Sequence, residues 1–301
     1  GKRVRPVIVL LIGAATALSA PQGARPEPDA AAEASGEHSL PNRRQLAAIT
    51  EMIHTASLIH DDVLDAADTR RGDSAVHRLY STKAAVLSGD FLLARASVML
   101  ARMNNAQVVR EMSKSLEALV QGELMQLRST PDERLSLEYY LTKSYCKTAS
   151  LMAYSCKSAA LLSGHAIESG VAVAAEKFGY HFGLAFQVID DLLDFTATDE
   201  QLGKPGLQDM SLGLSTAPVL YAAEEYPELK QLILRKFEAA GDVEAACGVV
   251  MKSAGLRRTK ELAAFHAQAA VDACCTLPPC EERDGPVSLD AVLLTLSLSL
   301  S

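Results

Sequence analysis

The amino-acid sequence predicts an all-α fold. Tryptophan is absent, aromatic residues make up only 5% of the chain, and Ala, Leu, Ser and Glu are abundant. Long segments repeat their apolar residues with the 3.6-residue period of a helix, whereas the two-residue alternation of strands is rare. With 301 residues, 49% of them hydrophobic, the chain can bury enough core for one large domain or two modest ones. We expect a single domain over residues 1–301 around a central apolar cavity.

The N-terminal part is expected to begin with a core helix. The charge-free run 7–20 follows Lys2, Arg3 and Arg5 and therefore resembles a signal peptide, but it is too short to span a bilayer. Residues 21–41 are rich in Pro, Ala, Gly and Glu and predict a flexible loop insertion. Residues 274–301 form an atypical C-terminal tail, because the last leucines alternate with Ser and Thr.

Two later helices are predicted by apolar faces that lead into an acidic motif. Leu46, Ile49 and Ile53 keep helical spacing before Asp61-Asp62-Val63-Leu64-Asp65. Phe182, Phe186 and Ile189 do the same before Asp190-Asp191-Leu192-Leu193-Asp194. Residues i and i+4 of a helix share a face, and residue i+1 lies about 100° away, so each Asp-Asp-x-x-Asp motif presents three carboxylates to one side.

Three carboxylates on one side of a helix repel one another unless a cation lies between them. Mg²⁺ is usually held by one or two carboxylates, several waters and the phosphate oxygens of a substrate. The sequence therefore predicts a Mg²⁺ site that grips a diphosphate through Asp61, Asp62, Asp65, Asp190, Asp191 and Asp194. One such motif alone is more often a solvated acidic turn. Two copies at the ends of apolar faces favour a cleft.

Basic and polar residues close to these motifs predict anion binding. Arg70 and Arg71 follow the first motif, and guanidinium groups bind phosphate oxygens bidentately. Lys2 and Arg5 precede an apolar helix, whose N-terminus favours an anion, and His54 lies two helical turns before Asp61. The other candidates are Lys147, Thr148, Gln187 and Lys204. In isolation, Arg-Arg-Gly would be an exposed turn and the histidine a structural residue.

The candidates together indicate one type of reaction. A metal-rich site and a basic site would flank an apolar cleft without an activated nucleophile or a redox motif, so we expect metal-assisted loss of diphosphate. The net charge of −8 argues against a nucleic acid as partner. The six cysteines form no Cys-x-x-Cys pair, and we expect reduced thiols in an intracellular compartment.

In these motifs the chain resembles the trans-polyprenyl diphosphate synthases. GKRVRP, HTASLIHDDVLDAADTRRG, GDFLLARA, KTASL, FQVIDDLLDF and GKP occur in the order of that family, over about residues 1–270. The resemblance implies an isoprenoid-synthase helical bundle and a Mg²⁺-dependent prenyltransferase. It implies that the catalytic residues are Asp61, Asp62, Asp65, Asp190, Asp191, Lys147 and Lys204.

The resemblance also implies which substrate each basic residue binds. The allylic substrate, farnesyl or geranylgeranyl diphosphate, would contact Arg70, Lys147, Gln187 and Lys204, with Thr148 beside them. Isopentenyl diphosphate would contact Lys2, Arg5, His54 and Arg71.

Two local features favour a long product. Residues 209–218 lack the Arg and Lys that short-chain members usually carry after the second motif. Ala56 and Ser57, which precede Asp61 by five and four positions, are small and leave a path along the helix open to a growing tail. Alternatively, they are small only so that two helices can pack closely.

Within the family, the local sequence resembles that of long-chain members of animals. These work in mitochondria with a related second subunit, as a heterotetramer, and make the ubiquinone side chain. We therefore expect a hetero-oligomer, otherwise a homodimer, with contact to a membrane surface when the product is released. The open alternatives are a shorter-chain farnesyl or geranylgeranyl diphosphate synthase and a regulatory subunit of a heteromeric synthase. The second acidic motif argues against a terpene cyclase, and no calcium-binding loop is present.

Overall fold

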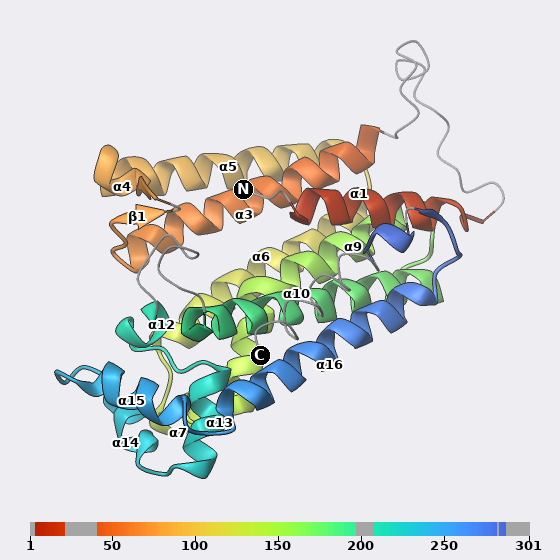
Figure 1. The fold of residues 1–301 in the computed structure, drawn as a ribbon. Coiled ribbons are helices and arrows are strands. Elements are labelled where there is room, and N and C mark those ends of the chain that lie inside the picture. Colours follow the sequence, from red (N-terminus) through yellow and green to blue (C-terminus); the bar gives the residue numbers. More distant parts are fainter. Residues whose placement is uncertain (1–3, 22–40, 71, 197–206, 282, 287–301) are drawn as a thin grey trace.

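The computed structural model describes residues 4–21, 41–70, 72–196, 207–281 and 283–286. The prediction of an all-α fold is confirmed (Figure 1). The expected loop insertion, most of the C-terminal tail and the candidates Lys2, Arg71 and Lys204 lie outside the described residues. The helices are α1 (Val4–Ala17), α3 (Pro41–Leu64), α4 (Val76–Leu79), α5 (Thr82–Arg102), α6 (Ala106–Leu127), α7 (Pro131–Arg134), α8 (Leu137–Ser144), the π-helix η1 (Tyr145–Ala149), α9 (Ser150–Leu162), α10 (Gly170–Thr196), α12 (Gln208–Ser211), α13 (Ala217–Glu225), α14 (Leu229–Leu234), α15 (Asp242–Val250) and α16 (Gly255–Cys275).

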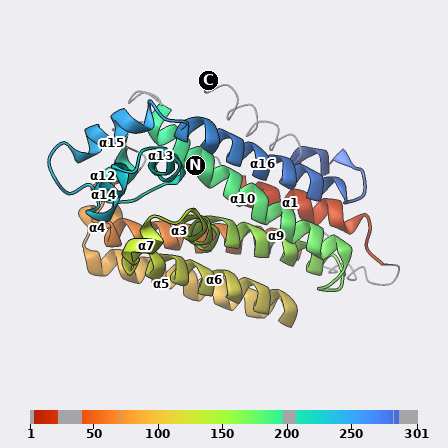
Figure 2. The same cartoon turned by 90° about the horizontal axis from the view of Figure 1, so that it is seen from below.

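The long helices are arranged around α9 and α10. Helix α10 packs against α9 on one side and α16 on the other, while α6 and α1 also pack against α9. In Figure 2, α5 and α6 lie along one side of the molecule and α16 along the opposite side. Helices α3 and α10 end on the same side, where β1 and α12 are labelled in Figure 1. This arrangement brings both acidic motifs to one end of the bundle.

The predicted apolar faces form the core. The N-terminal run is the core helix α1, in which Ile8 and Ile12 are fully buried. Leu46, Ile49 and Ile53 of α3 are also fully buried. On α10, Phe182 and Ile189 are buried, but Phe186 is exposed, and its ring centre lies 6.0 Å from the guanidinium of Arg5.

Two glycines bring α9 and α10 into close contact. A Cβ atom on Gly179 would lie 2.6 Å from the carbonyl oxygen of Met152, and one on Gly183 would lie 2.4 Å from the Cα of Ala149. Real Cβ atoms do not approach backbone atoms this closely. Since the two glycines are four residues apart on one helix face, they let the two backbones touch over a full turn.

A second apolar cluster supports the end of the bundle that carries the motifs. It is formed by α13, α14 and α15 with α8 and the residue Met210 of α12. A two-residue antiparallel ladder, β1 (Thr69–Arg70) with β2 (Asp73–Ser74), follows α3. The sequence analysis did not predict this ladder. All six cysteines are free thiols.

Helix α5 lies at the surface with an apolar outer face. Leu87, Phe91 and Val98 form a stripe on α5, and Val120, Leu124 and Leu127 form another on the neighbouring α6; all six are exposed. Of the described helices, α5 alone is long and apolar enough to cross a membrane by length and composition, a test that helices of soluble proteins also pass. We call these two stripes the apolar face.

Candidate active site

The three carboxylates of the first acidic motif, at the end of α3, lie in different environments: one is bound by the protein and two are accessible to solvent. Asp62 is buried and accepts two hydrogen bonds from the guanidinium of Arg70, one of them from Nε at 2.7 Å. Asp61 is partly buried and Asp65 is exposed. Neither of these two side chains accepts a hydrogen bond from the described residues. The motif therefore offers two carboxylates to a ligand and uses the third to hold Arg70.

The second motif, near the end of α10, is divided in the same way. Asp191 is buried and accepts hydrogen bonds from Tyr140 Oη at 2.6 Å and from Gln187 Nε2 at 2.8 Å. Asp194 accepts from the backbone N–H groups of Gln208 and Asp209, both at 3.1 Å, and so fixes the start of α12. Asp190 is exposed.

Polar contacts run from η1 to the second motif. Thr148 Oγ1 donates to Gln187 Oε1 at 2.7 Å, and Gln187 in turn donates to Asp191. Thr148 and Lys147 belong to the π-helix η1, where one turn is widened and side chains are redirected; such turns are frequent at functional sites. The structure thus brings together three residues that were predicted to contact the allylic substrate or its metal.

Lys147 points toward the first motif. Its Nζ lies 2.7 Å from Glu123 Oε1 and donates to Gln126 Oε1 at 3.0 Å, both on α6. Gly122 permits this contact, because a Cβ there would lie 2.6 Å from Cγ of Lys147. Lys147 also acts on Asp61 electrostatically. The lysine is therefore held close to the first motif by an acid and an amide.

Burial and like charges raise the pKa values of the motif carboxylates. The pKa of Asp61 is raised to about 7, first by burial and then by the nearby Glu123. The pKa of Asp191 is raised to about 6, mainly by burial. Burial also raises the pKa of Asp209 well above its usual value, with Asp191, Asp194 and Asp190 adding to the effect. Carboxylates whose charged forms are disfavoured by burial and by neighbouring acids would be stabilised by a bound cation.

The structure describes two of the four residues predicted to form the second anion site, Arg5 and His54. Arg5 Nη1 lies 2.9 Å from His54 Nε2, and the Arg5 guanidinium lies 6.0 Å from the ring centre of Phe186. The structure therefore joins α1, α3 and α10 at this point. Lys2 and Arg71, the other two candidates for this site, lie outside the described residues.

The donor set suits a hard divalent cation that a substrate also binds. Within the described ranges, no group of three or more His, Cys, Asp or Glu side chains is placed so that it could hold a metal ion by itself. Asp61 and Asp65 nevertheless present oxygen ligands that no described residue hydrogen-bonds, and Mg²⁺ commonly completes its shell with water and phosphate oxygens. These residues fit Mg²⁺ bound together with a diphosphate.

Several residues of this site were not recognised in the sequence. They are Glu123 and Gln126, which hold Lys147, and Tyr140, which donates to Asp191. Gly122 inside an otherwise helical segment was an available signal, since such a glycine often marks a close approach. Nothing in the local sequence indicates that Tyr140 reaches a residue 51 positions away.

The two small residues before the first motif differ in environment. Ala56 is fully buried. Ser57 is partly buried, and its hydroxyl donates to the carbonyl of His54 at 2.9 Å. The channel along this face of α3 remains a prediction.

A family model and similar curated proteins indicate the same family. The model of the polyprenyl synthetase family matches residues 1–250. The chain is 46% identical over 294 residues to a mitochondrial solanesyl-diphosphate synthase 1 from Oryza sativa, covering 97% of this chain and 67% of that protein. It is 40% identical over 295 residues to the all trans-polyprenyl-diphosphate synthase PDSS1 of Homo sapiens, covering 98% and 68%.

A solved structure supports the same relationship. A polyprenyl synthase from Caulobacter crescentus, complexed with calcium and isoprenyl diphosphate, superposes with a TM-score of 0.82 at 30% identity, covering 99% of this chain and 85% of that one.

The raised pKa values predict how pH and Mg²⁺ together affect stability. Between about pH 4 and pH 7 the folded, metal-free chain keeps protons on Asp61 and Asp191 that the unfolded chain releases. The free energy of unfolding should therefore fall as the pH rises through this window. Mg²⁺ must displace these protons, so the rise in Tm on adding Mg²⁺ should be small at pH 5 and larger at pH 8. Thermal melts with Mg²⁺ and with EDTA measure both effects.

The matched variant for this measurement is Asp61→Asn. It should flatten the pH dependence in EDTA and reduce the gain from Mg²⁺ at pH 8. An equal gain from Mg²⁺ at pH 5 and pH 8 in the unmodified chain would contradict the prediction.

Proposed function

The chain belongs to the polyprenyl synthetase family and is a prenyltransferase that makes long-chain trans-prenyl diphosphates; we propose that Asp61, Asp65 and Asp190 hold the Mg²⁺ on which this reaction depends. The observation that carries the proposal is the division of labour within each motif. Asp62 and Asp191 accept hydrogen bonds from other side chains of the protein, whereas Asp61 and Asp65 accept none from the described residues and can bind a ligand. Helix α10 brings Asp190 to the same end of the bundle. Bound Mg²⁺ would supply the positive charge that stabilises the departing diphosphate.

The chain's own residues account for the rest of the chemistry. Lys147, held by Glu123 and Gln126, places a cation beside the first motif, where the diphosphate of the allylic substrate would lie. Thr148 and Gln187 fix the orientation of Asp191. Arg70 would contact the same diphosphate from its position on Asp62, and Lys204 belongs to the proposed set as well.

Isopentenyl diphosphate would be held by the second set, in which Arg5 contacts His54, together with Lys2 and Arg71. Loss of diphosphate from the allylic substrate leaves a carbocation, which the double bond of isopentenyl diphosphate attacks. The released diphosphate then takes up the proton that the condensed product loses. The protein needs no nucleophile for this sequence. Holding the two substrates side by side supplies much of the rate enhancement.

We propose that the product tail runs along α3 past Ala56 and Ser57. Both residues lie one turn or slightly more before Asp61, so a tail leaving the metal site in this direction passes them first. Relatives named mitochondrial support a mitochondrial location and a role in making the ubiquinone side chain.

The apolar face supports association with another synthase chain. The six exposed residues lie on two adjacent helices, and stripes of this kind usually mark a protein interface. We propose that a related second subunit covers this face in a heterotetramer, with a second copy of this chain as the other occupant. Contact with a membrane surface during product release is a further part of this proposal.

The metal site is tested by removing one carboxylate from each motif. Asp61→Ala and Asp190→Ala should lower turnover by about 10²-fold or more, because each removes a charge-stabilising ligand of the leaving group. Helical circular dichroism should be unchanged, since neither side chain belongs to the core. Radiolabelled isopentenyl diphosphate incorporation with Mg²⁺ measures turnover. Asp272→Asn on α16 is the control. Wild-type activity in either motif variant would show that the mutated aspartate is not a metal ligand needed for turnover.

The path of the tail is tested by Ala56→Phe. If the tail passes Ala56, products should shorten to a few isoprene units while Tm changes little, because the ring occupies space that the tail would fill. If Ala56 only allows close packing, the ring should destabilise the fold by about 1–3 kcal/mol and leave product length unchanged. Thin-layer chromatography of the products and thermal melts separate the two outcomes. Ala48→Phe, at an exposed position of α3, is the control.

The apolar face is tested by placing charges on it. Phe91→Glu combined with Leu127→Glu should leave this chain monomeric and unable to retain a co-expressed second subunit, as measured by light scattering after gel filtration. Phe265→Glu on α16, where the ring is similarly exposed, should leave assembly unchanged. Full long-chain synthesis by the unmodified chain alone would contradict the need for a second subunit.

A further inference from the structure

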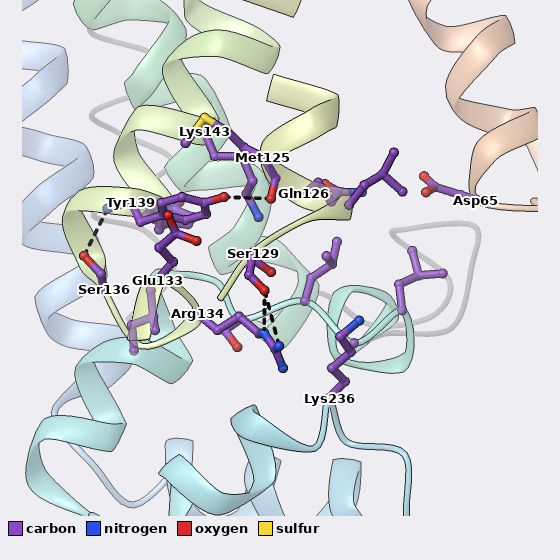
Figure 3. Close-up of a pocket in the computed structure, with 17 residues that line it drawn as sticks. Asp65, Met125, Gln126, Ser129, Glu133, Arg134, Ser136, Tyr139, Lys143 and Lys236 are labelled. Atoms are coloured by element: carbon purple, nitrogen blue, oxygen red, sulfur yellow. Dashed lines mark hydrogen bonds between the residues drawn. The ribbon is translucent and has the colours of Figure 1, made fainter. Parts of the chain in front are cut away.

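A pocket of about 220 Å³ lies beside the two acidic motifs (Figure 3). Its walls come from the end of α6, from α7 and α8, from residues 212–215 and from Lys236 after α14. Asp65 of the first motif lies at its edge, and Tyr140, which donates to Asp191 of the second motif, is part of its wall. We call this cavity the side pocket. It therefore includes Asp65 of the first motif and reaches the second motif only through Tyr140, and neither Asp61 nor Lys147 lines it.

Three cations from different elements line the side pocket. They are Arg134, Lys143 and Lys236, and Figure 3 shows them on different sides of it. Within the described ranges, none of the three forms an ion pair. Arg134 donates only to the carbonyl oxygens of Ser129 and Leu234, which orient the guanidinium without neutralising it.

Lys143 is the least expected of the three. It is partly buried, and burial lowers its pKa. No described carboxylate lies within ion-pair distance of its Nζ, although Asp191 and Asp209 act on it from farther away. Burying an ammonium group without a partner is costly. A fold that tolerates this cost next to a cavity is suited to an anion that enters the cavity.

The remaining polar groups of the side pocket do not cancel this charge. Of its two carboxylates, Glu133 accepts the backbone N–H of Thr130 at 2.7 Å and closes the capping box of α7. Asp65 lies at the edge. The hydroxyl groups of Ser129, Ser136 and Ser215 can each donate a hydrogen bond. The pocket thus carries an excess of positive charge in a chain whose net charge is −8.

We propose that the side pocket binds inorganic diphosphate after it has left the allylic substrate. This assignment rests on the proposed function for the source of the ligand. Diphosphate carries several negative charges and only acceptor oxygens, so it requires cations and hydroxyl donors, which the pocket provides. The pocket borders the motifs where the anion is released. A diphosphate group could also arrive as the head of a prenyl diphosphate, and the experiment below separates the two sources.

Lys236 offers a variant that separates binding from folding. It follows α14 with a φ of 57°, in the left-handed region. Its N–H donates to Ile233 and that of Phe237 donates to Leu232, both at 3.0 Å, which is the arrangement of a helix end that usually has glycine at this position. Lys236→Gly should therefore fold at least as stably as the unmodified chain, while removing one cation from the pocket.

The test is calorimetric titration of sodium diphosphate into the whole chain in EDTA, with isopentenyl diphosphate present to fill the second-substrate site. The unmodified chain should bind one diphosphate. Lys143→Gln and Lys236→Gly should each weaken that binding roughly tenfold, the usual effect of losing a hydrogen bond to a charged group. Arg128→Gln, an exposed cation near the pocket but not lining it, should have no effect.

The other outcomes decide against either the pocket or the proposed function. Unchanged affinity in both pocket variants, or equal weakening in Arg128→Gln, would overturn it. Binding of a second isopentenyl diphosphate in place of the inorganic anion would show that the pocket takes prenyl diphosphate heads instead. Since the titration needs no turnover, diphosphate binding by a chain without synthase activity would refute only the proposed function. If the pocket variants bind diphosphate normally and keep full activity, only the proposal that the side pocket binds diphosphate is refuted.

Discussion

The close contact between α9 and α10 is the constraint on which the site depends. Gly179 and Gly183 place α10 directly against the backbone of α9 at Ala149 and Met152. One turn further along, the same approach brings Thr148 to Gln187 at 2.7 Å. Any side chain on these glycines would push the helices apart and lengthen this hydrogen bond, which fixes Gln187 and, through it, Asp191. The position of Asp191 therefore depends on the absence of a Cβ atom at Gly179 and Gly183.

We propose that each acidic motif combines a structural role with a ligand-binding role. The buried aspartate of each pair, Asp62 or Asp191, satisfies its oxygens with donors from the protein, since a buried carboxylate without donors would be costly. Burial and the nearby Glu123 raise the pKa of Asp61 to about 7, so a bound cation would stabilise the charged form of this carboxylate. Adjacent aspartates on a helix point in different directions, so one sequence motif can meet both requirements.

Periodicity and motif spacing predicted much of the fold and part of the site. The buried faces of α1, α3 and α10 follow from helical spacing, which is a local property of the sequence. The contacts of Lys147 with Glu123 and of Tyr140 with Asp191 could not be predicted in this way, because they depend on how helices pack. Lys143 was overlooked for the same reason: a lone lysine becomes unusual only when its surroundings are known to lack a carboxylate partner.

We propose that the charges along η1 and α9 limit how far an apolar product tail can follow these helices. Lys147, at the motif end, pairs with Glu123, and Lys157, ten residues later, pairs with Glu176 and with the fully buried Glu111. Ten residues of helix span about 15 Å. Between the two charged layers, α9 is lined by buried small and apolar residues. A prenyl tail can replace apolar contacts in that interval but cannot replace the partners of Glu111, because an unpaired buried carboxylate is strongly unfavourable. A longer tail must therefore turn away from α9 before it reaches the second layer.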